Sequence, residues 1–328
     1  MIIRLEIEEL FGLYSYDLDF TNADGSLIKI ITGPNGYGKT TIIRLISALY
    51  NRDYDLMFSV RFKRLVYHFD GRVLEVSQTR IMDDNENIDI PKVKLQQLNL
   101  CFYAEDEMPT QGERFEIVCP LKGNEKDALN GFNVFMNSRQ CFYIADDRLV
   151  SIKTDYRDET LCIDTGVLPS DIHAFKKLLD TNGYKVGEED KLEESFRKKL
   201  DLFRSIVANS CFADKTMQIH ARYGLRFKSH NELGEFIDIE KLSSGEKHIL
   251  VQCLELLFHA KDGMVALVDE PELSFHPAWL NQYIGHIESI QTMKSLEGKP
   301  FQIILATHSP QLIGQRWDKC LDLYEQRR

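Results

Sequence analysis

The sequence contains no hydrophobic run that is long enough to cross a membrane. None of its stretches approaches the roughly 18 consecutive apolar residues of a membrane-spanning helix. The N-terminus, "MIIRLEIEEL", alternates apolar and charged residues, which is typical of a strand and not of a signal peptide. The seven cysteines are scattered and form no CxxC pair. We therefore expect a cytoplasmic protein with structural thiols and no membrane partner.

The chain also lacks an excess of positive charge, an internal repeat and any low-complexity segment. It has 328 residues, and 40 lysines and arginines against 51 acidic residues give a formal net charge of −11. A protein that grips DNA over a wide surface usually carries a basic face, so this balance disfavours a stand-alone DNA binder. With 43% hydrophobic residues, the chain can bury the core of one large domain or two ordinary ones.

Residues 33–40 read "GPNGYGKT" and fit the phosphate-binding pattern G-x-x-x-x-G-K-[ST]. The apolar run "SLIKIITG" precedes this loop and the helical pattern "KTTIIRLISALYN" follows it. Backbone N–H groups in such a loop surround phosphate oxygens, Lys39 reaches the β- and γ-phosphates, and the Thr40 hydroxyl binds Mg²⁺. The motif predicts ATP and Mg²⁺ as ligands. The predicted binding residues here are Asn35, Gly36, Gly38, Lys39, Thr40 and Thr41, and Lys39 also has a catalytic role.

A second acidic motif, "MVALVDEPE", ends an apolar run of strand length at residues 264–272. Ligands of α/β sheets bind at the carboxyl ends of strands. We predict that Asp269 holds the Mg²⁺ shell and that Glu270 is the general base that orients the attacking water. Acidic residues often end a strand without such a role, and the phosphate-binding loop is what favours the functional interpretation.

Residues 241–257, "KLSSGEKHILVQCLELL", allow two interpretations. Ser243 and Glu246 form an S-x-x-E capping box, so the segment predicts a well-capped helix. The letters "LSSGE" also resemble the LSGGQ signature of ATP-binding cassette proteins, and they lie about twenty-five residues before Asp269. In that class the serine and glycine amides contact the γ-phosphate held by a second subunit, which assigns Ser243 and Gly245 to nucleotide binding.

The segment "IILATHSPQL" places His308 after another apolar run, where we expect a switch histidine beside the γ-phosphate. Gln140 is a candidate sensor of Mg²⁺ from its position in the chain only. Arg148 is either a charge partner in the same region or part of a surface ion pair. Ser274 and His276 occupy a loop that could reach across a dimer interface.

The strand and helix patterns predict an α/β fold with a mixed sheet, an antiparallel N-terminal β-subdomain and a small helical insertion. Together with the resemblance of "LSSGE" to the cassette signature, they imply a P-loop NTPase head of the ATP-binding cassette type. A hairpin is expected at residues 64–79, a polar loop at 83–89, and helices at 170–185, 188–210 and 277–296. We expect an N-terminal lobe at residues 1–165, a helical insertion or arm at 166–235, and a C-terminal lobe at 236–328.

Taken together, "GPNGYGKT", "LSSGEK", "LVDEPELSFHP" and "ATHSPQL" resemble ATPases of the SMC/RecF/OLD group, including stand-alone AAA ATPases of bacterial anti-phage defence. The resemblance implies a homodimer in which ATP lies between the P-loop of one subunit and the Ser243–Gly245 segment of the other. The "DEPELSFHP" form resembles OLD-type defence ATPases more than transporter ATPases. The sequence shows no long coiled coil, no nuclease cluster and no room for a TOPRIM domain after His308; if the chain is complete, we expect a nuclease or toxin effector in trans.

Three alternatives stay open at this point. The first is a DNA-repair clamp of RecF type that binds DNA directly, and nucleic acid remains a possible partner. The second is the nucleotide-binding subunit of a transporter, which "PELSFHP" and the hairpin-rich N-terminal lobe disfavour. The third is an ATP-binding scaffold that barely turns over, because Glu270 is present whether hydrolysis is fast or slow.

Overall fold

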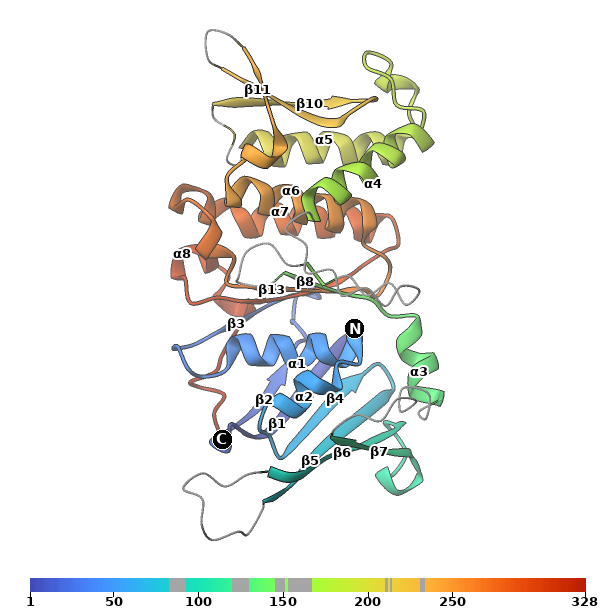
Figure 1. Cartoon of the computed structure of the whole chain (residues 1–328), viewed down its shortest axis with the longest axis vertical. Coiled ribbons are helices and arrows are strands. Elements are labelled where there is room, and N and C mark those ends of the chain that lie inside the picture. Colours follow the sequence, from blue (N-terminus) through green and yellow to red (C-terminus); the bar gives the residue numbers. More distant parts are fainter. Residues whose placement is uncertain are drawn as a thin grey trace. The chain divides into compact units, whose positions relative to one another are not determined.

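The computed structural model describes residues 1–82, 93–119, 130–144, 151–152, 167–209, 212, 214–230 and 234–328. The chain forms two compact units (Figure 1). The first comprises residues 1–141, 302–308 and 318–328, and the second comprises residues 142–301 and 309–317. The predicted loop at 83–89 and Arg148 lie outside the described residues.

The first unit contains a six-stranded antiparallel sheet in the order β2-β1-β4-β5-β6-β7. Alternating residues such as Leu5 and Ile7 face its core. The predicted antiparallel N-terminal β-subdomain and the hairpin at residues 64–79 are confirmed by the antiparallel registers of β1 with β2 and of β4 with β5. The strands are β1 (Ile2–Leu10), β2 (Tyr14–Asp19), β4 (Arg64–Phe69), β5 (Arg72–Met82), β6 (Val93–Ala104) and β7 (Glu113–Cys119).

The first unit also contains three parallel strands. Strand β3 (Ile28–Thr32) lies between β14 (Gln302–Ala306) and β15 (Cys320–Asp322). Every residue of β3 and β14 is buried, which is the environment that their continuous apolar runs predict. The buried amide of Gln302 donates to the Ile2 carbonyl at 2.8 Å and accepts from the Ile2 N–H at 2.9 Å. These two bonds tie β14 to the first strand of the antiparallel sheet.

Helix α1 (Lys39–Asn51) is the helix that the sequence predicted after the phosphate-binding loop. It packs against β14, and the Tyr67 hydroxyl of β4 donates to its Leu45 carbonyl at 3.2 Å. At the end of α1, the Arg52 guanidinium donates to the Asn133 carbonyl and the Asn137 side chain at 3.1 and 2.9 Å. These bonds attach α3 (Asn130–Asn137) to α1, while α2 (Tyr54–Ser59) follows α1 directly.

The second unit contains β13 (Val265–Asp269), β8 (Cys141–Ile144) and β9 (Ser151–Ile152), with β9 antiparallel to β8. Helix α6 (Ser244–Cys253) continues into the π-helical turn η5 (Leu254–His259), and η5 packs against α7 (Pro277–Leu296). The short helix α8 (Pro310–Ile313) also packs on α7. Pro277 begins α7, as predicted. Within the described ranges, no helix is both long and apolar enough to span a membrane.

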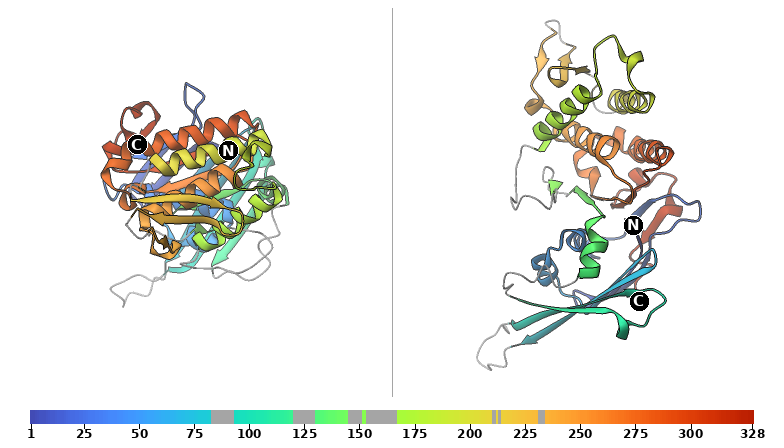
Figure 2. Two further views of the ribbon diagram at one scale, coloured as in Figure 1. Left: turned by 90° about the horizontal axis from the view of Figure 1, so that it is seen from above. Right: turned by 90° about the vertical axis from the view of Figure 1, so that its right-hand side faces the viewer.

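The second unit also contains helices α4 (Val167–Thr181) and α5 (Glu194–Asn209), which confirm the two helical patterns of the predicted insertion. The rings of Phe175, Phe203 and Phe258 meet at centroid distances of 5.1 to 5.9 Å and join α4 and α5 to η5. A three-stranded antiparallel sheet covers these helices: β10 (Lys215–His220), β11 (Gly224–Ser229) and β12 (Phe236–Ile237) (Figures 1 and 2). The sequence did not predict this small sheet.

Lys294 of α7 is an unusual core residue, because its side chain is fully buried. Burial, together with the nearby positive charge of Lys199, lowers the pKa of its ammonium to about 8. The Glu297 carboxylate lies 3.9 Å away and is already bound by Lys199 at 2.9 Å and by the Ser195 hydroxyl at 3.0 Å. The positive charge of protonated Lys294 is therefore only weakly balanced by a neighbouring negative charge.

We expect Lys294→Met to raise the free energy of unfolding at pH 7 by roughly 1–3 kcal/mol, because a buried ammonium is replaced by an apolar side chain of similar length. The folded-state pKa lies below the unfolded value of 10.5. The destabilisation caused by the buried Lys294 ammonium is therefore complete below about pH 8, and it disappears as the pH rises toward 10.5. Urea unfolding at pH 7 and 10 measures both values, with Lys185→Met, at an exposed lysine of the same unit, as the control. An equal gain at both pH values would contradict this explanation.

Candidate nucleotide-binding site

The loop at residues 33–40 has the backbone that its glycines allow. Gly33, Gly36 and Gly38 have φ angles of 140°, 85° and 92°, a region that residues with a Cβ rarely adopt. At Gly38 a Cβ would also lie 2.8 Å from Leu10 Cδ2, and at Gly33 it would lie 3.3 Å from Leu323 Cβ. The loop is therefore fixed by backbone conformation and by close packing at both of its ends.

The loop leads directly into α1, whose first residue is Lys39. The Lys39 ammonium is buried and donates to the Gly33 and Pro34 carbonyls at 2.9 and 3.3 Å, so it lies inside the curve of the loop. Thr40 and Thr41 follow in the first helical turn, where N–H groups point away from the helix. This arrangement is suited to an anion such as a phosphate group.

His308 lies close to this loop because β3 and β14 are parallel neighbours, which brings their carboxyl ends to one edge. Ala306 pairs with Ile31, and the Thr307 N–H donates to the Ile31 carbonyl at 3.1 Å. His308 is the next residue and is exposed. The strand patterns thus bring His308 and the start of the loop together within the first unit. Its role as a switch histidine stays a prediction.

Tyr37 occupies a position of the loop at which the phosphate-binding motif specifies no residue type, and it belongs to a group of aromatic residues. Its ring stacks on Tyr14 at a centroid distance of 5.2 Å, and Tyr324 lies at 6.1 Å. The Tyr16 hydroxyl donates to the Tyr37 carbonyl at 2.8 Å, and burial raises the pKa of Tyr16 well above its ordinary value, so it remains a donor. These rings offer a flat apolar surface beside the phosphate loop, which suits a nucleobase.

In the second unit, Asp269 is the last residue of β13 and is 1% exposed. Glu270 follows with φ 40° and ψ 55°, a left-handed conformation that is costly for a residue with a Cβ. Pro271 comes next, and proline disfavours helical conformations in the residue before it. The chain therefore turns sharply at Glu270, which separates the directions of the two carboxylates. Such strain is common at functional sites and agrees with separate predicted roles for Asp269 and Glu270.

The segment 243–245 forms the start of α6, and the predicted capping box is confirmed. The Ser243 hydroxyl accepts from the Glu246 N–H at 3.3 Å, and the Glu246 carboxylate accepts from the Ser243 N–H at 2.7 Å. Ser243 is exposed, whereas Gly245 and Glu246 are buried. The first turn of α6 thus has a fixed backbone and an accessible serine.

The Glu246 carboxylate has another partner, which the sequence analysis missed. Lys215 of β10 donates to it at 2.7 Å, and the side chains of Lys215 and Glu246 are 16% and 3% exposed. Burial alone would lower the pKa of Lys215, but the bonds to Glu246 and Asp214 outweigh it and raise the pKa. Thirty-one residues separate the two partners, and no short motif signals such a pair.

The other candidate residues are less closely connected to these groups. Gln140 is exposed and lies between α3 and β8, so it precedes a strand instead of following one. His276 caps α7, because its Nδ1 accepts from the Ala278 N–H at 3.3 Å. The Ser274 side chain lies outside the described residues. The predicted roles of Gln140, Ser274 and His276 stay predictions.

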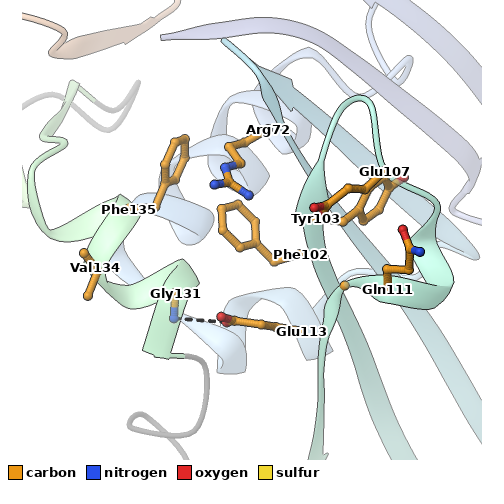
Figure 3. A pocket seen from close by; sticks show the side chains of 10 residues that line it. Arg72, Phe102, Tyr103, Glu107, Gln111, Glu113, Gly131, Val134 and Phe135 are labelled. Atoms are coloured by element: carbon orange, nitrogen blue, oxygen red, sulfur yellow. Dashed lines mark hydrogen bonds between the residues drawn. The ribbon is translucent and has the colours of Figure 1, made fainter.

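A separate pocket in the first unit lies between β5, β6, β7 and α3 (Figure 3). The Arg72 guanidinium lies 5.8 Å from the centroid of the Phe102 ring, and the Gly131 N–H donates to Glu113 at 3.0 Å. None of the predicted site residues lines this pocket. It is therefore distinct from the phosphate-binding loop.

The Thr40 hydroxyl and the Asp269 carboxylate are each an oxygen ligand of the kind that Mg²⁺ prefers, and their roles in binding it stay predictions. In the part of the chain that the structure describes, no three His, Cys, Asp or Glu side chains gather into a metal cluster. Magnesium in ATPases usually takes one or two protein ligands and fills its shell with phosphates and water. A dedicated protein cage is therefore not required.

Comparison with protein families supports the interpretation of these motifs. Residues 158–314 match the family described as "AAA domain, putative AbiEii toxin, Type IV TA system". The matched segment, just under half of the chain, contains Ser243, Asp269 and His308 but not residues 33–40, and binding of ATP and Mg²⁺ is general to P-loop ATPases of this kind. No curated protein is significantly similar to the chain.

Several solved structures of SMC head domains are also similar. One is an Smc head bound to the C-winged helix domain of ScpA. The sequence identity is 15%, the match covers 95% of this chain and 90% of that chain, and the TM-score is 0.43. Another, with an extended coiled coil and bound to the C-terminal domain of ScpA from Pyrococcus furiosus, has 14% identity, the same coverage and a TM-score of 0.42. A head with a coiled coil and joint from Pyrococcus yayanosii has 10% identity, coverages of 95% and 93%, and a TM-score of 0.40.

We expect Lys215→Met to lower the free energy of unfolding by roughly 2 kcal/mol, because it leaves the buried Glu246 carboxylate without its ion-pair partner. Methionine preserves most of the apolar stem, so the loss reports mainly on the charge. Urea unfolding at pH 7 measures it. Lys241→Met, at an exposed lysine close to the same turn, is the matched control and should change stability by less than about 0.5 kcal/mol.

The double variant Lys215→Met/Glu246→Gln separates the ion pair from general damage to the turn. A glutamine at position 246 can still accept from the Ser243 N–H but carries no charge. We therefore expect the double variant to be more stable than Lys215→Met alone. Additive losses from the two substitutions would contradict a coupled pair.

Proposed function

Because residues 158–314 match an AAA-domain family, we propose that this protein is a Mg-ATP-dependent switch that dimerises around ATP and controls a partner effector. ATP joins two copies of the chain, and hydrolysis separates them. The observation that carries the proposal is the exposed, capped start of α6 at Ser243, a helix N-terminus whose N–H groups suit a phosphate. One P-loop suffices to hold one triphosphate, so a second phosphate contact at the start of α6 suits the nucleotide of another subunit.

Each candidate residue has a defined task in this proposal. The loop amides at Asn35, Gly36 and Gly38 bind phosphate oxygens, and Lys39 neutralises their charge. Thr40 and Asp269 hold Mg²⁺, which supplies charge neutralisation at the phosphates when it is bound. Glu270 orients and deprotonates the attacking water, and His308 contacts the γ-phosphate from the adjacent strand. Ser243 and Gly245 serve the ATP of the other copy.

The effector is proposed to be a nuclease or toxin encoded separately, with a role in anti-phage defence. The family description names a toxin and a type IV toxin–antitoxin system, and this supports an association with such systems. The chain itself supplies the ATP-controlled change of assembly. Its partner supplies the damaging chemistry.

We expect Glu270→Gln to trap a dimer in Mg-ATP, because the general base is lost while the phosphate contacts remain. Turnover should fall by about 10²-fold or more. Light scattering after size exclusion should show one subunit without nucleotide and two with Mg-ATP. Asp262→Asn removes an exposed carboxylate just before β13 and should behave like the unaltered protein. A monomer under both conditions would overturn the clamp, and unchanged turnover would remove Glu270 from the mechanism.

We expect Ser243→Arg to retain nucleotide binding but lose hydrolysis, because the serine acts on the ATP of the other subunit. Loss of the cap alone should cost about 1 kcal/mol of stability, so thermal unfolding is measured with ATP binding and turnover. Ser295→Arg adds the same charge at an exposed position of α7 and serves as the control. Loss of ATP binding by a folded Ser243→Arg protein would count against a role in trans.

A further inference from the structure

The two faces of the β10–β12 sheet differ in their surroundings. On the inner face, Ile219, Leu225 and Phe227 are buried and the strands pack on α4 and α5. At Gly224 this packing is so close that a Cβ would lie 3.1 Å from the Ile172 carbonyl oxygen of α4. The opposite face lies on the outer side of these helices in both views of Figure 2. We call this surface, with its β10–β11 turn, the outer face.

The outer face displays two large aromatic side chains around an arginine. Tyr223 and Phe236 are 45% and 49% exposed. The Arg226 guanidinium lies 4.5 Å from the Tyr223 ring centroid and 3.6 Å from the Phe236 ring centroid. These contacts hold the two rings in place by cation–π attraction and leave about half of their surface accessible. Exposed apolar rings in a fixed arrangement are typical of a binding surface.

The charge of the outer face is opposite to that of the whole chain. The strand register places Arg226 and Lys228 on it, and Arg222 lies in the β10–β11 turn. Among the described residues, no carboxylate forms a salt bridge with these three side chains, whereas Asp214 is engaged by Lys215 at the start of β10. The nearby titratable groups include His220, His230 and the exposed carboxylate of Glu235, which precedes Phe236. A local cationic surface on a protein of net charge −11 is complementary to a polyanion.

We propose that the outer face binds single-stranded nucleic acid. Arg222, Arg226 and Lys228 contact successive phosphates, while bases stack on Tyr223 and Phe236. A duplex keeps its bases inside, so it would use the cations but not the rings. An acidic protein segment would likewise leave the rings without a stacking partner. The combination of flat rings and cations that form no salt bridge among the described residues therefore favours a single strand over both. The proposal does not depend on ATP or on dimerisation.

Fluorescence anisotropy of the full chain without nucleotide tests this proposal. The probes are a labelled 12-residue oligothymidylate, the matching oligouridylate and a 12-base-pair duplex, at 50 and 200 mM NaCl. We expect at least one single strand to bind about tenfold more tightly than the duplex, with affinity falling as salt increases. The strand that binds better identifies the preferred sugar. Polyglutamate should not compete at equal charge concentration.

Substitutions locate the binding surface. Arg226→Ala and Phe236→Ala should each weaken binding at least fivefold, since one removes a cation between the rings and the other removes a ring. Phe236→Leu keeps apolar volume without the ring and should weaken binding similarly, which guards against a folding defect. The controls are Lys261→Ala and Trp317→Ala, which remove an exposed cation and an exposed ring elsewhere in the same unit.

The proposal would be overturned by no binding at micromolar protein in 50 mM NaCl, by equal affinity for strand and duplex, or by equal losses from the control substitutions. Effective competition by polyglutamate would also overturn it, because it would show that charge alone is recognised. Since no nucleotide is present, failure here would leave the ATP-dependent dimer of Glu270→Gln unaffected.

Discussion

The conformation of the segment around Ser243 depends on one buried carboxylate. Glu246 accepts the Ser243 N–H and the Lys215 ammonium, both at 2.7 Å, so one side chain closes the capping box and joins α6 to β10. A buried charge is costly unless its hydrogen bonds are complete, and here each carboxylate oxygen has a donor. The serine that is proposed to reach a partner's phosphate is therefore oriented before any ligand binds. Preorganisation of this kind lowers the entropic cost of binding.

The phosphate-binding loop is held by a different means, through hydrogen bonds of the backbone. Strand β3 is paired on both sides, with β14 and with β15, and the Leu323 N–H donates to the Thr32 carbonyl just before Gly33. The loop therefore leaves a strand whose end cannot shift sideways. The Thr307 N–H bonds to the neighbouring Ile31 carbonyl and fixes the backbone next to His308. The Glu246 carboxylate thus orients the start of α6 at Ser243, whereas strand pairing orients the phosphate-binding loop.

Local patterns predicted the features that depend on nearby residues. The phosphate-binding loop, the hairpin around Gly71 and the capping box of Ser243 all lie within short segments, and the structure contains each of them. The sheet of β10–β12 was missed although its two longer strands alternate, because each run is short and holds only two apolar alternating positions: Met217 and Ile219 in β10, and Leu225 and Phe227 in β11. The Lys215–Glu246 pair was missed because it joins residues far apart in sequence. Neither propensity nor a motif encodes a contact that only tertiary packing creates.

The missed sheet changes how the inserted segment is understood. Strand β10 points Lys215 inward to Glu246, while the next residue, Thr216, points outward, because neighbouring side chains in a strand face opposite sides. One short strand therefore borders both the proposed nucleic-acid surface and the turn that carries Ser243. A ligand that displaced β10 by an ångström would lengthen the 2.7 Å bond between Lys215 and Glu246. The only link between β10 and the capping box described here is this ion pair, so its energy would limit any coupling between the two.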